Sequence, residues 1–185
     1  MNKIQNKLKS NPVIAAIRSE KQLEIALKSN CEIIFILSAN IFNVGLYIRE
    51  IKKSNKEAFV HIDFLEGLGK DKKAIEYIAK RLKPDGIITT RSNLIKYAKS
   101  IGLFAIQRFF IVDSQSVYTC INTINNIKPD MAEIMPGLMP KIIKDLSTNV
   151  KTPIIAGGLV TQKKEIQLLL LNGAMGVSIG NDKLW

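Results

Sequence analysis

Short apolar runs alternate with longer amphipathic stretches along the whole chain. The runs are rich in Ile, Val and Phe, which is typical of strands buried on both faces of a parallel sheet. Eight such strands are predicted, at Val13–Ile17, Glu32–Leu37, Ala58–Ile62, Gly86–Thr90, Leu103–Gln107, Met131–Met135, Pro153–Ala156 and Ala174–Ile179.

Between the runs, apolar residues recur at helical spacing. Helices with start or stop signals, such as a Ser or Thr at the beginning and a Gly at the end, are predicted over Ser19–Ser29, Asp71–Leu82, Ser92–Gly102 and Thr161–Gly173. Weaker helical patterns fill the remaining gaps, at Ile41–Lys52, Gln115–Ile127 and Pro140–Ser147.

Strands that recur about every 23 residues, each followed by a helix, predict an α/β fold of the (β/α)8 barrel type. An open flavodoxin-like sheet would need only about five strands, so eight favour closure. The chain has 185 residues, whereas such barrels usually have at least about 200. The loops must therefore be short, and the last helix is predicted to be a single turn near Asn181–Trp185. We expect one barrel domain over residues 1–185.

A Lys-Pro-Asp sequence occurs twice at the end of a predicted helix, at Lys83–Asp85 and Lys128–Asp130. Proline ends the helix and aspartate suits the turn into the next strand. The repetition predicts two equivalent helix-to-strand joints, although Pro-Asp is also common turn chemistry.

The formal net charge of +11 favours acidic partners such as nucleic acid or phosphorylated ligands. Solvated helix faces rich in lysine would give the same charge. Cys31 and Cys120 lack metal-ligand spacing and are predicted to be buried free thiols. Residues 1–20 lack the apolar core of a signal peptide, and no run approaches the ~18 residues of a membrane span. These features predict a cytoplasmic protein without a membrane partner.

The glycine pair Gly157 and Gly158 follows the seventh predicted strand, and Ser178 and Gly180 end the eighth. Loops after these two strands often hold phosphate in this fold. Glycine lets backbone N–H groups approach an anion closely, and the dipole of a helix opening at Thr161 would add attraction. We therefore expect a phosphate site here; the alternative is that the glycines serve only the turn.

Polar residues at the carboxyl ends of other strands would face the same opening of the barrel, called the mouth below. His61 could act as a general base or could orient a ligand, or it could be a satisfied structural group. Glu133 shares its alternation with Met131 and Met135, so it should point into the mouth and needs a partner, with Arg18 and Arg108 as candidates. Asp63 and Glu133 could bind Mg²⁺, but they form no regular motif, so no metal is expected.

Basic residues flank the predicted helix after the third strand, and Arg91 continues the basic surface into the next predicted helix. They could contact RNA phosphates, and the candidates are Lys70, Lys72, Lys73, Lys80, Arg81 and Arg91. Phe109 and Phe110 stand beside Arg108 and could stack on unpaired bases, but core packing is the favoured interpretation. The lysines lie on helices and loops rather than in strands, which argues against a Schiff-base mechanism.

Several segments together resemble the glycerol-3-phosphate-responsive antiterminator family, in order and over essentially the whole chain. They include "VHIDFLEGLGKD" (Val60–Asp71), "KPDGIITTRSNLIKYAK" (Lys83–Lys99), "KPDMAEIMPGLMPKII" (Lys128–Ile143) and "PIIAGGLV" (Pro153–Val160). The resemblance implies a small (β/α)8-type barrel without established enzymatic activity. By motif, it implies the ligand residues His61, Asp63, Arg108, Glu133, Gly137, Gly157, Gly158 and Ser178.

The resemblance also implies that the protein binds glycerol 3-phosphate as an effector, needs no cofactor, and binds leader mRNA to prevent early termination of glycerol uptake genes. The alternative is a phosphate-binding barrel enzyme, an isomerase or synthase of a small phosphorylated metabolite. Such an enzyme needs an acid–base pair within reach of one substrate, for example His61 with Glu133 or Asp63. A homo-oligomer is possible, and it would use helix faces or loops because a closed barrel has no free sheet edge.

Overall fold

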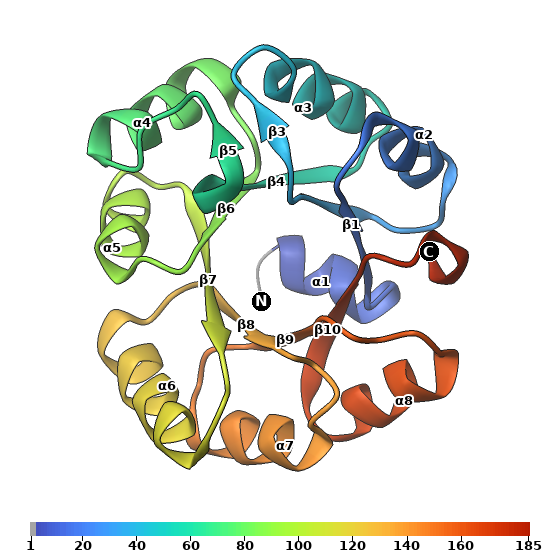
Figure 1. The fold of residues 1–185 in the computed structure, drawn as a ribbon, viewed down its shortest axis with the longest axis vertical. Coiled ribbons are helices and arrows are strands. Elements are labelled where there is room, and N and C mark those ends of the chain that lie inside the picture. Colours follow the sequence, from blue (N-terminus) through green and yellow to red (C-terminus); the bar gives the residue numbers. More distant parts are fainter. Residues whose placement is uncertain (1–2) are drawn as a thin grey trace.

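Eight parallel strands close into a barrel in the protein, a computed structural model that describes residues 3–185 (Figure 1). Around the barrel the strands follow the order β1-β10-β9-β8-β7-β6-β4-β2. Their bounds are β1 Val13–Ile17, β2 Ile33–Ile36, β4 Glu57–His61, β6 Gly86–Thr89, β7 Phe104–Phe110, β8 Met131–Met135, β9 Ile154–Gly157 and β10 Ala174–Ile179. The predicted (β/α)8 barrel is confirmed, and each predicted strand overlaps one barrel strand.

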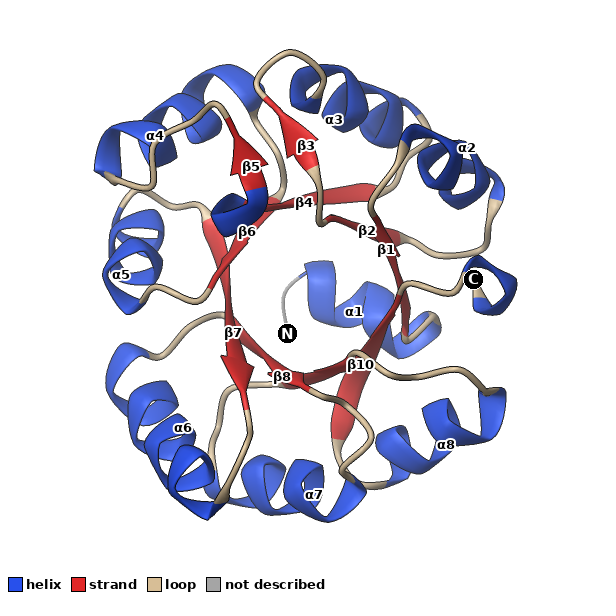
Figure 2. Cartoon of the chain, viewed as in Figure 1, coloured by secondary structure: helices blue, strands red, loops and turns tan. Residues whose placement is uncertain are grey.

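Helices surround the barrel on its outer side (Figure 2). They are α2 Glu20–Lys28, α3 Val44–Lys53, α4 Lys72–Tyr77, α5 Ser92–Ser100, α6 Ser114–Ile127, α7 Pro140–Asn149 and α8 Lys163–Leu171, and α4 continues as the π-helical segment η2 Ile78–Leu82. After β10 only a short 3-10 turn remains, η3 Asp182–Leu184, in agreement with the predicted truncation.

Some bounds differ from the prediction for local reasons. Helix α3 begins at Val44 rather than Ile41, because the Asn40 side chain accepts hydrogen bonds from the N–H groups of Phe42 and Asn43 and forms a turn there. Helix α8 begins at Lys163 rather than Thr161. Two short strands, β3 (Ala39–Asn40) and β5 (Leu65–Glu66), pair with each other beyond the ends of β2 and β4 and were not predicted.

An unpredicted helix, α1 (Lys3–Ser10), lies across the amino-terminal end of the barrel and is visible through its centre (Figure 1). Its buried residues Ile4 and Leu8 join the apolar cluster inside the barrel. Lys3 and Lys7 form ion pairs with the buried Glu57, at 2.7 and 2.9 Å. With two apolar positions among mostly polar residues, this segment has too narrow an apolar stripe to be predicted as a core helix.

The part of the barrel interior that is nearer to α1 is filled by large apolar side chains. Phe59 packs edge-to-face against Phe35 on one side and Phe104 on the other, each pair with ring centroids 5.6 Å apart. The remaining apolar clusters lie between the barrel and the surrounding helices. The interior formed by the large apolar side chains is therefore a packed core rather than a channel.

The two Lys-Pro-Asp segments form equivalent joints. In each, the aspartate side chain accepts a hydrogen bond from a strand N–H at 2.9 Å: Asp85 from Ala58, and Asp130 from Ala105. Each aspartate also forms an ion pair with a lysine of a preceding helix, Lys52 at 3.4 Å and Lys99 at 3.2 Å. The two segments are therefore equivalent in structure as well as in sequence.

Within residues 3–185, no helix combines the length and the apolar character needed to cross a bilayer. Cys31 and Cys120 are buried free thiols, as predicted. Burial raises the pKa of the Cys120 thiol to about 12, so this thiol stays protonated at neutral pH.

Candidate functional site

The barrel interior changes from apolar to polar near the carboxyl ends of the strands. Side chains alternate along a strand, so the interior face of β7 continues from Ile106 to Arg108, and that of β8 from Met131 to Glu133. On β4 the same face continues from Phe59 to His61. The mouth is therefore floored by buried polar groups resting on an apolar core.

Arg108 and Glu133 form a buried ion pair at the centre of this floor. Their residues are paired in register across β7 and β8, and Arg108 Nε–H donates to Glu133 Oε2 at 2.6 Å. The second carboxylate oxygen, Oε1, accepts a hydrogen bond from Ser178 Oγ at 2.6 Å. Both oxygens of Glu133 thus have protein partners, which offset the cost of burying the charge.

The glycines around this ion pair make room for it. A Cβ on Gly157 would lie 2.4 Å from Ser178 Oγ and 2.8 Å from Glu133 Oε1. A Cβ on Gly137 would lie 2.9 Å from the Gly157 nitrogen, and Gly137 N–H donates to the Gly158 carbonyl at 3.2 Å. Gly137 and Gly157 are therefore required for close packing, whatever ligand the loop holds.

Several backbone N–H groups at the mouth have no acceptor among residues 3–185. They belong to Gly158, Leu159, Gly180 and Asn181, in the loops after β9 and β10. Gly158 and Leu159 both have positive φ, 81° and 62°, and successive N–H groups in such a turn can form a concave anion site.

A carboxylate lies at the turn that precedes α8. The N–H groups of Thr161 and Gln162 both donate to the Glu165 side chain, at 2.7 and 3.0 Å. The start of α8 is therefore closed by its own capping carboxylate rather than left open to an external anion. The carboxylate also adds negative charge at this position, which opposes the approach of an anion to the turn before α8.

His61 is buried, with 1% of its surface exposed, and its ring lies against Phe64 with 4.5 Å between centroids and 25° between planes. Neither ring nitrogen has a hydrogen-bond partner within the described residues. Burial, followed by the positive charge of Arg108, lowers the pKa of His61 to about 3. The imidazole is therefore neutral at physiological pH, with one nitrogen able to donate and the other able to accept a hydrogen bond.

Asp63 is held by groups from the loop after β6. Its carboxylate accepts hydrogen bonds from Thr90 N–H at 2.8 Å and from the Thr89 hydroxyl at 3.1 Å, and it pairs with Arg91 at 3.3 Å. Burial opposes ionisation of Asp63, but these hydrogen bonds outweigh it and lower the pKa of the carboxyl. Asp63 thus joins the β4 and β6 loops. No group of three potential metal-ligating side chains occurs in residues 3–185.

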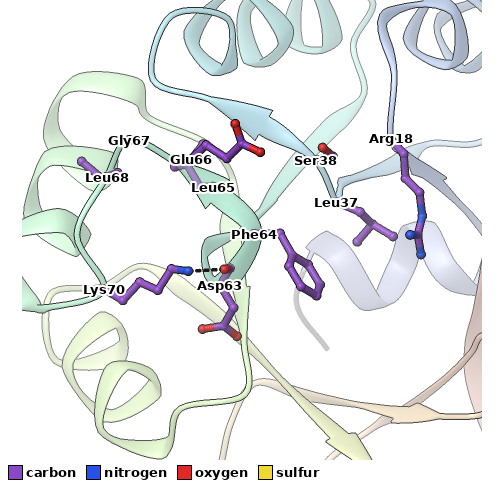
Figure 3. A pocket seen from close by; sticks show the side chains of 10 residues that line it. All are labelled: Arg18, Leu37, Ser38, Asp63, Phe64, Leu65, Glu66, Gly67, Leu68 and Lys70. Carbon is purple, nitrogen blue, oxygen red and sulfur yellow. Dashed lines mark hydrogen bonds between the residues drawn. The ribbon is translucent and has the colours of Figure 1, made fainter.

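A cavity of about 530 Å³ opens beside this network (Figure 3). It lies between the loops after β1, β2 and β4, and Arg18, Phe64 and Lys70 contribute to its lining. Arg18 is exposed, and in the view its side chain and the Phe64 ring both extend over the barrel opening. The cavity is therefore on the β1, β2 and β4 side of the mouth, and its Arg18 end adjoins the loop after β10, because β1 pairs with β10.

The predicted RNA-binding residues are all exposed, but many have partners. Lys73 and Lys80 pair with Glu76, at 3.3 and 3.8 Å, and the Lys72 ammonium lies 5.3 Å from the centre of the Tyr97 ring. Lys70 donates to the Asp63 carbonyl, and Arg91 pairs with the Asp63 carboxylate. The set is therefore divided into two groups. Lys70 and Arg91 lie at the mouth, whereas Lys72, Lys73, Lys80 and Arg81 lie on α4 and its continuation η2.

Sequence reasoning missed several residues of the mouth. Phe64 follows the predicted strand without a signal, and Thr89 and Thr90 belong to the end of the fourth predicted strand, where no local pattern indicates a contact with Asp63. Gln22 lies within a predicted helix, yet its side chain accepts from Arg18 N–H at 2.8 Å and donates to the Gly180 carbonyl at 3.1 Å. It therefore links the loops after the first and last strands. Phe109 is partly buried in the core, whereas Phe110 is 54% exposed.

The model of the family described as glycerol-3-phosphate responsive antiterminator matches residues 13–185. The chain belongs to this family. Among curated proteins, the chain is 35% identical over 178 residues to "Uncharacterized protein YgcP" of Escherichia coli K12, an alignment that covers 96% of this chain and 93% of the relative. The resemblance drawn from the sequence segments is thus confirmed.

Solved structures agree with the assignment to the antiterminator family. A glycerol uptake operon antiterminator regulatory protein from Listeria monocytogenes is 29% identical, with a TM-score of 0.91 and 95% coverage of each chain. A glycerol uptake operon antiterminator-related protein from Thermotoga maritima is 30% identical, with a TM-score of 0.83 and coverage of 94% of this chain and 96% of its own.

Barrel enzymes share the fold at lower identity. Orotidine 5'-phosphate decarboxylase from Pyrococcus horikoshii is 18% identical, with a TM-score of 0.68 and coverage of 90% of this chain and 88% of its own. At this identity the likeness concerns the architecture alone, because one barrel supports many chemistries.

Proposed function

We propose that the chain is an antitermination regulator of glycerol uptake genes, which binds glycerol 3-phosphate at the barrel mouth and leader mRNA through a basic surface. The observation that carries the proposal is the family match over residues 13–185. The high similarity to the Listeria protein, over 95% of each chain, points the same way. Glycerol 3-phosphate is the effector in this proposal, and no cofactor is needed.

The mouth offers complementary groups for both parts of glycerol 3-phosphate. The N–H groups of Gly158, Leu159, Gly180 and Asn181, which have no acceptor in residues 3–185, would hold the phosphate oxygens. The neutral imidazole of His61, with both nitrogens unpaired among the described residues, would exchange hydrogen bonds with a hydroxyl group. The ligand would thus satisfy polar groups that the fold leaves without protein partners.

The same geometry gives less support to the enzyme alternative. Both oxygens of Glu133 are engaged by Arg108 and Ser178, and Asp63 is held by Thr89, Thr90 and Arg91. His61, with a pKa of about 3, is a weak base at neutral pH, whereas general bases work best when their pKa is near the operating pH. The mouth therefore favours ligand binding over acid–base chemistry.

Isothermal titration calorimetry with glycerol 3-phosphate tests the effector site, with glycerol and inorganic phosphate as controls. A matched pair of variants at Gly180 places the test at the phosphate loops, because a Cβ there would meet only the Ala16 carbonyl at 3.8 Å. Gly180→Asp adds a negative charge and should weaken binding by at least about tenfold, or about 1.4 kcal/mol. The isosteric Gly180→Asn should weaken it less. If the wild type, Gly180→Asp and Gly180→Asn all bind glycerol 3-phosphate with equal affinity, the phosphate is not bound next to Gly180.

Regulation requires that the effector changes RNA affinity. Glycerol 3-phosphate should therefore bind the RNA-competent state more tightly than the other state. A labelled leader transcript of the glycerol uptake genes from the source genome would be titrated with and without the effector. Unchanged RNA affinity would contradict the regulatory coupling, and a flat dependence of log affinity on log salt would contradict binding through basic residues.

A further inference from the structure

Three of the seven phenylalanines have exposed rings, and all three lie at or beyond the carboxyl end of a strand. Phe42 is 90% exposed, and Phe64 and Phe110 are each 54% exposed. Phe42 follows β3, Phe64 follows β4, and Phe110 is the last residue of β7. Exposed apolar rings cost hydration free energy, and when they gather on one face of a protein they mark an interaction surface.

Phe64 is the best supported of the three rings. It is stacked on the buried imidazole of His61 and extends over the barrel opening, next to the cavity beside the mouth (Figure 3). A ring with a rigid support on one side loses little conformational entropy when a second flat group stacks on it. This arrangement suits a nucleobase, because every base has a π-face.

Positive charges lie around the same ring. Arg18 and Lys70 line the cavity together with Phe64. Asp63, the residue before Phe64, binds Lys70 through its carbonyl and Arg91 through its carboxylate. Cations that flank an exposed aromatic ring are the usual combination in sites for single-stranded nucleic acid, where phosphates meet the cations while bases stack.

We propose that the leader RNA crosses the barrel mouth, with an unpaired base stacked on Phe64 and its phosphates against Arg18, Lys70 and Arg91. This inference rests on the proposed function, which supplies the RNA partner, and it assigns the RNA to the mouth instead of the outer face of α4. It also provides a coupling: an effector hydrogen-bonded to His61 fixes the imidazole, and Phe64 is stacked on that imidazole. The same mouth therefore contains the effector site and the stacking platform.

Fluorescence anisotropy with a labelled, unstructured segment of the leader transcript tests the proposal, with saturating glycerol 3-phosphate present. Phe64→Leu keeps an apolar side chain but removes the ring, and it should weaken RNA binding roughly 5- to 100-fold. Its salt dependence should stay as in the wild type, because no cation is lost. Phe64→Trp should retain affinity. The matched control is Tyr118→Leu, which removes a ring that is 63% exposed on α6, outside the barrel and not part of the cavity lining.

Two further arms separate this inference from its alternatives. The same RNA annealed to its complement should bind more weakly than the single strand, because paired bases cannot stack on Phe64. Calorimetry should show that Phe64→Leu loses much less affinity for glycerol 3-phosphate than for RNA, because the proposed effector contact is with His61 and not with the ring, and circular dichroism should show that the variant is folded at the assay temperature.

Each contrary result would overturn the inference. Wild-type protein that binds no leader RNA would remove the proposed function and this inference together. If the wild type binds RNA and Phe64→Leu binds it equally well, only the mouth assignment fails. An equal loss of effector and RNA affinity in Phe64→Leu would make Phe64 a cover over the effector. A wild-type dimer that becomes monomeric in Phe64→Leu, with RNA affinity unchanged, would assign the ring to a second copy of this chain.

Discussion

Arg108 and Glu133 face each other across β7 and β8 as an ion pair enclosed in the barrel, with 2.6 Å between Nε and Oε2. Their side chains are only 3% and 1% exposed. Taking two charges out of water is costly, so such a pair is stable only while both partners and their hydrogen bonds are in place. The pair therefore fixes the geometry of the mouth, and it is vulnerable to the loss of either member.

Glu133→Leu should destabilise the protein by about 3–5 kcal/mol, because it leaves the Arg108 charge buried without a partner. Urea unfolding monitored by circular dichroism would measure the free energy of unfolding. Ser178→Ala, which removes one neutral donor to the same carboxylate, should cost only about 1–2 kcal/mol. The double variant Arg108→Met with Glu133→Leu should recover part of the loss. A double variant no more stable than Glu133→Leu alone would show that the uncompensated charge is not the cause.

Gly157→Ala should be much more destabilising than Gly180→Ala. The new Cβ at Gly157 would lie 2.4 Å from Ser178 Oγ and 2.8 Å from Glu133 Oε1, whereas at Gly180 it would meet only the Ala16 carbonyl at 3.8 Å. Overpacking of a filled core typically costs about 1–3 kcal/mol. Thermal and urea unfolding of the two variants would be compared. Similar stabilities would contradict a packing requirement at Gly157 and would leave ligand approach as the reason for the glycine.

The fold was predictable because its signals are local, whereas the site depends on register between strands. Buried runs and helix signals locate the eight barrel strands and the helices between them, and the alternation with Met131 and Met135 correctly points Glu133 into the mouth. The choice of Arg108 over Arg18 as its partner follows from the β7–β8 register, which no local pattern contains. The contacts of Asp63 with the threonines after β6 are non-local in the same way.

Asp85→Ala and Asp130→Ala should have similar effects, because the two joints are built alike. Each substitution leaves a buried strand N–H, of Ala58 or Ala105, without its side-chain acceptor, at a cost of about 1–3 kcal/mol. Asparagine at either position retains an acceptor oxygen and should cost less. The joints share no hydrogen-bond partner, so the double variant should equal the sum of the singles within about 0.5 kcal/mol. Strongly different losses in the free energy of unfolding for Asp85→Ala and Asp130→Ala, measured with urea, would refute the equivalence of the joints.

The buried His61 should make stability depend on pH. Its pKa is about 3 in the folded protein against 6.5 for an ordinary histidine, so the unfolded chain binds the extra proton first as the pH falls. Stability is therefore fully retained above about pH 6.5 and is lost progressively from there down to about pH 3.

The comparison that isolates this effect is wild type against His61→Gln. Between about pH 7 and pH 5, the wild type should lose about 2 kcal/mol more of its free energy of unfolding than the variant. Carboxylates with a lowered pKa, such as Glu57 and Asp63, lose their contribution at more acidic pH and do so in both proteins, so they cancel. If the free energy of unfolding falls equally in the two proteins over this range, His61 has an ordinary pKa in the fold, and the argument that it is too weak a base for catalysis fails.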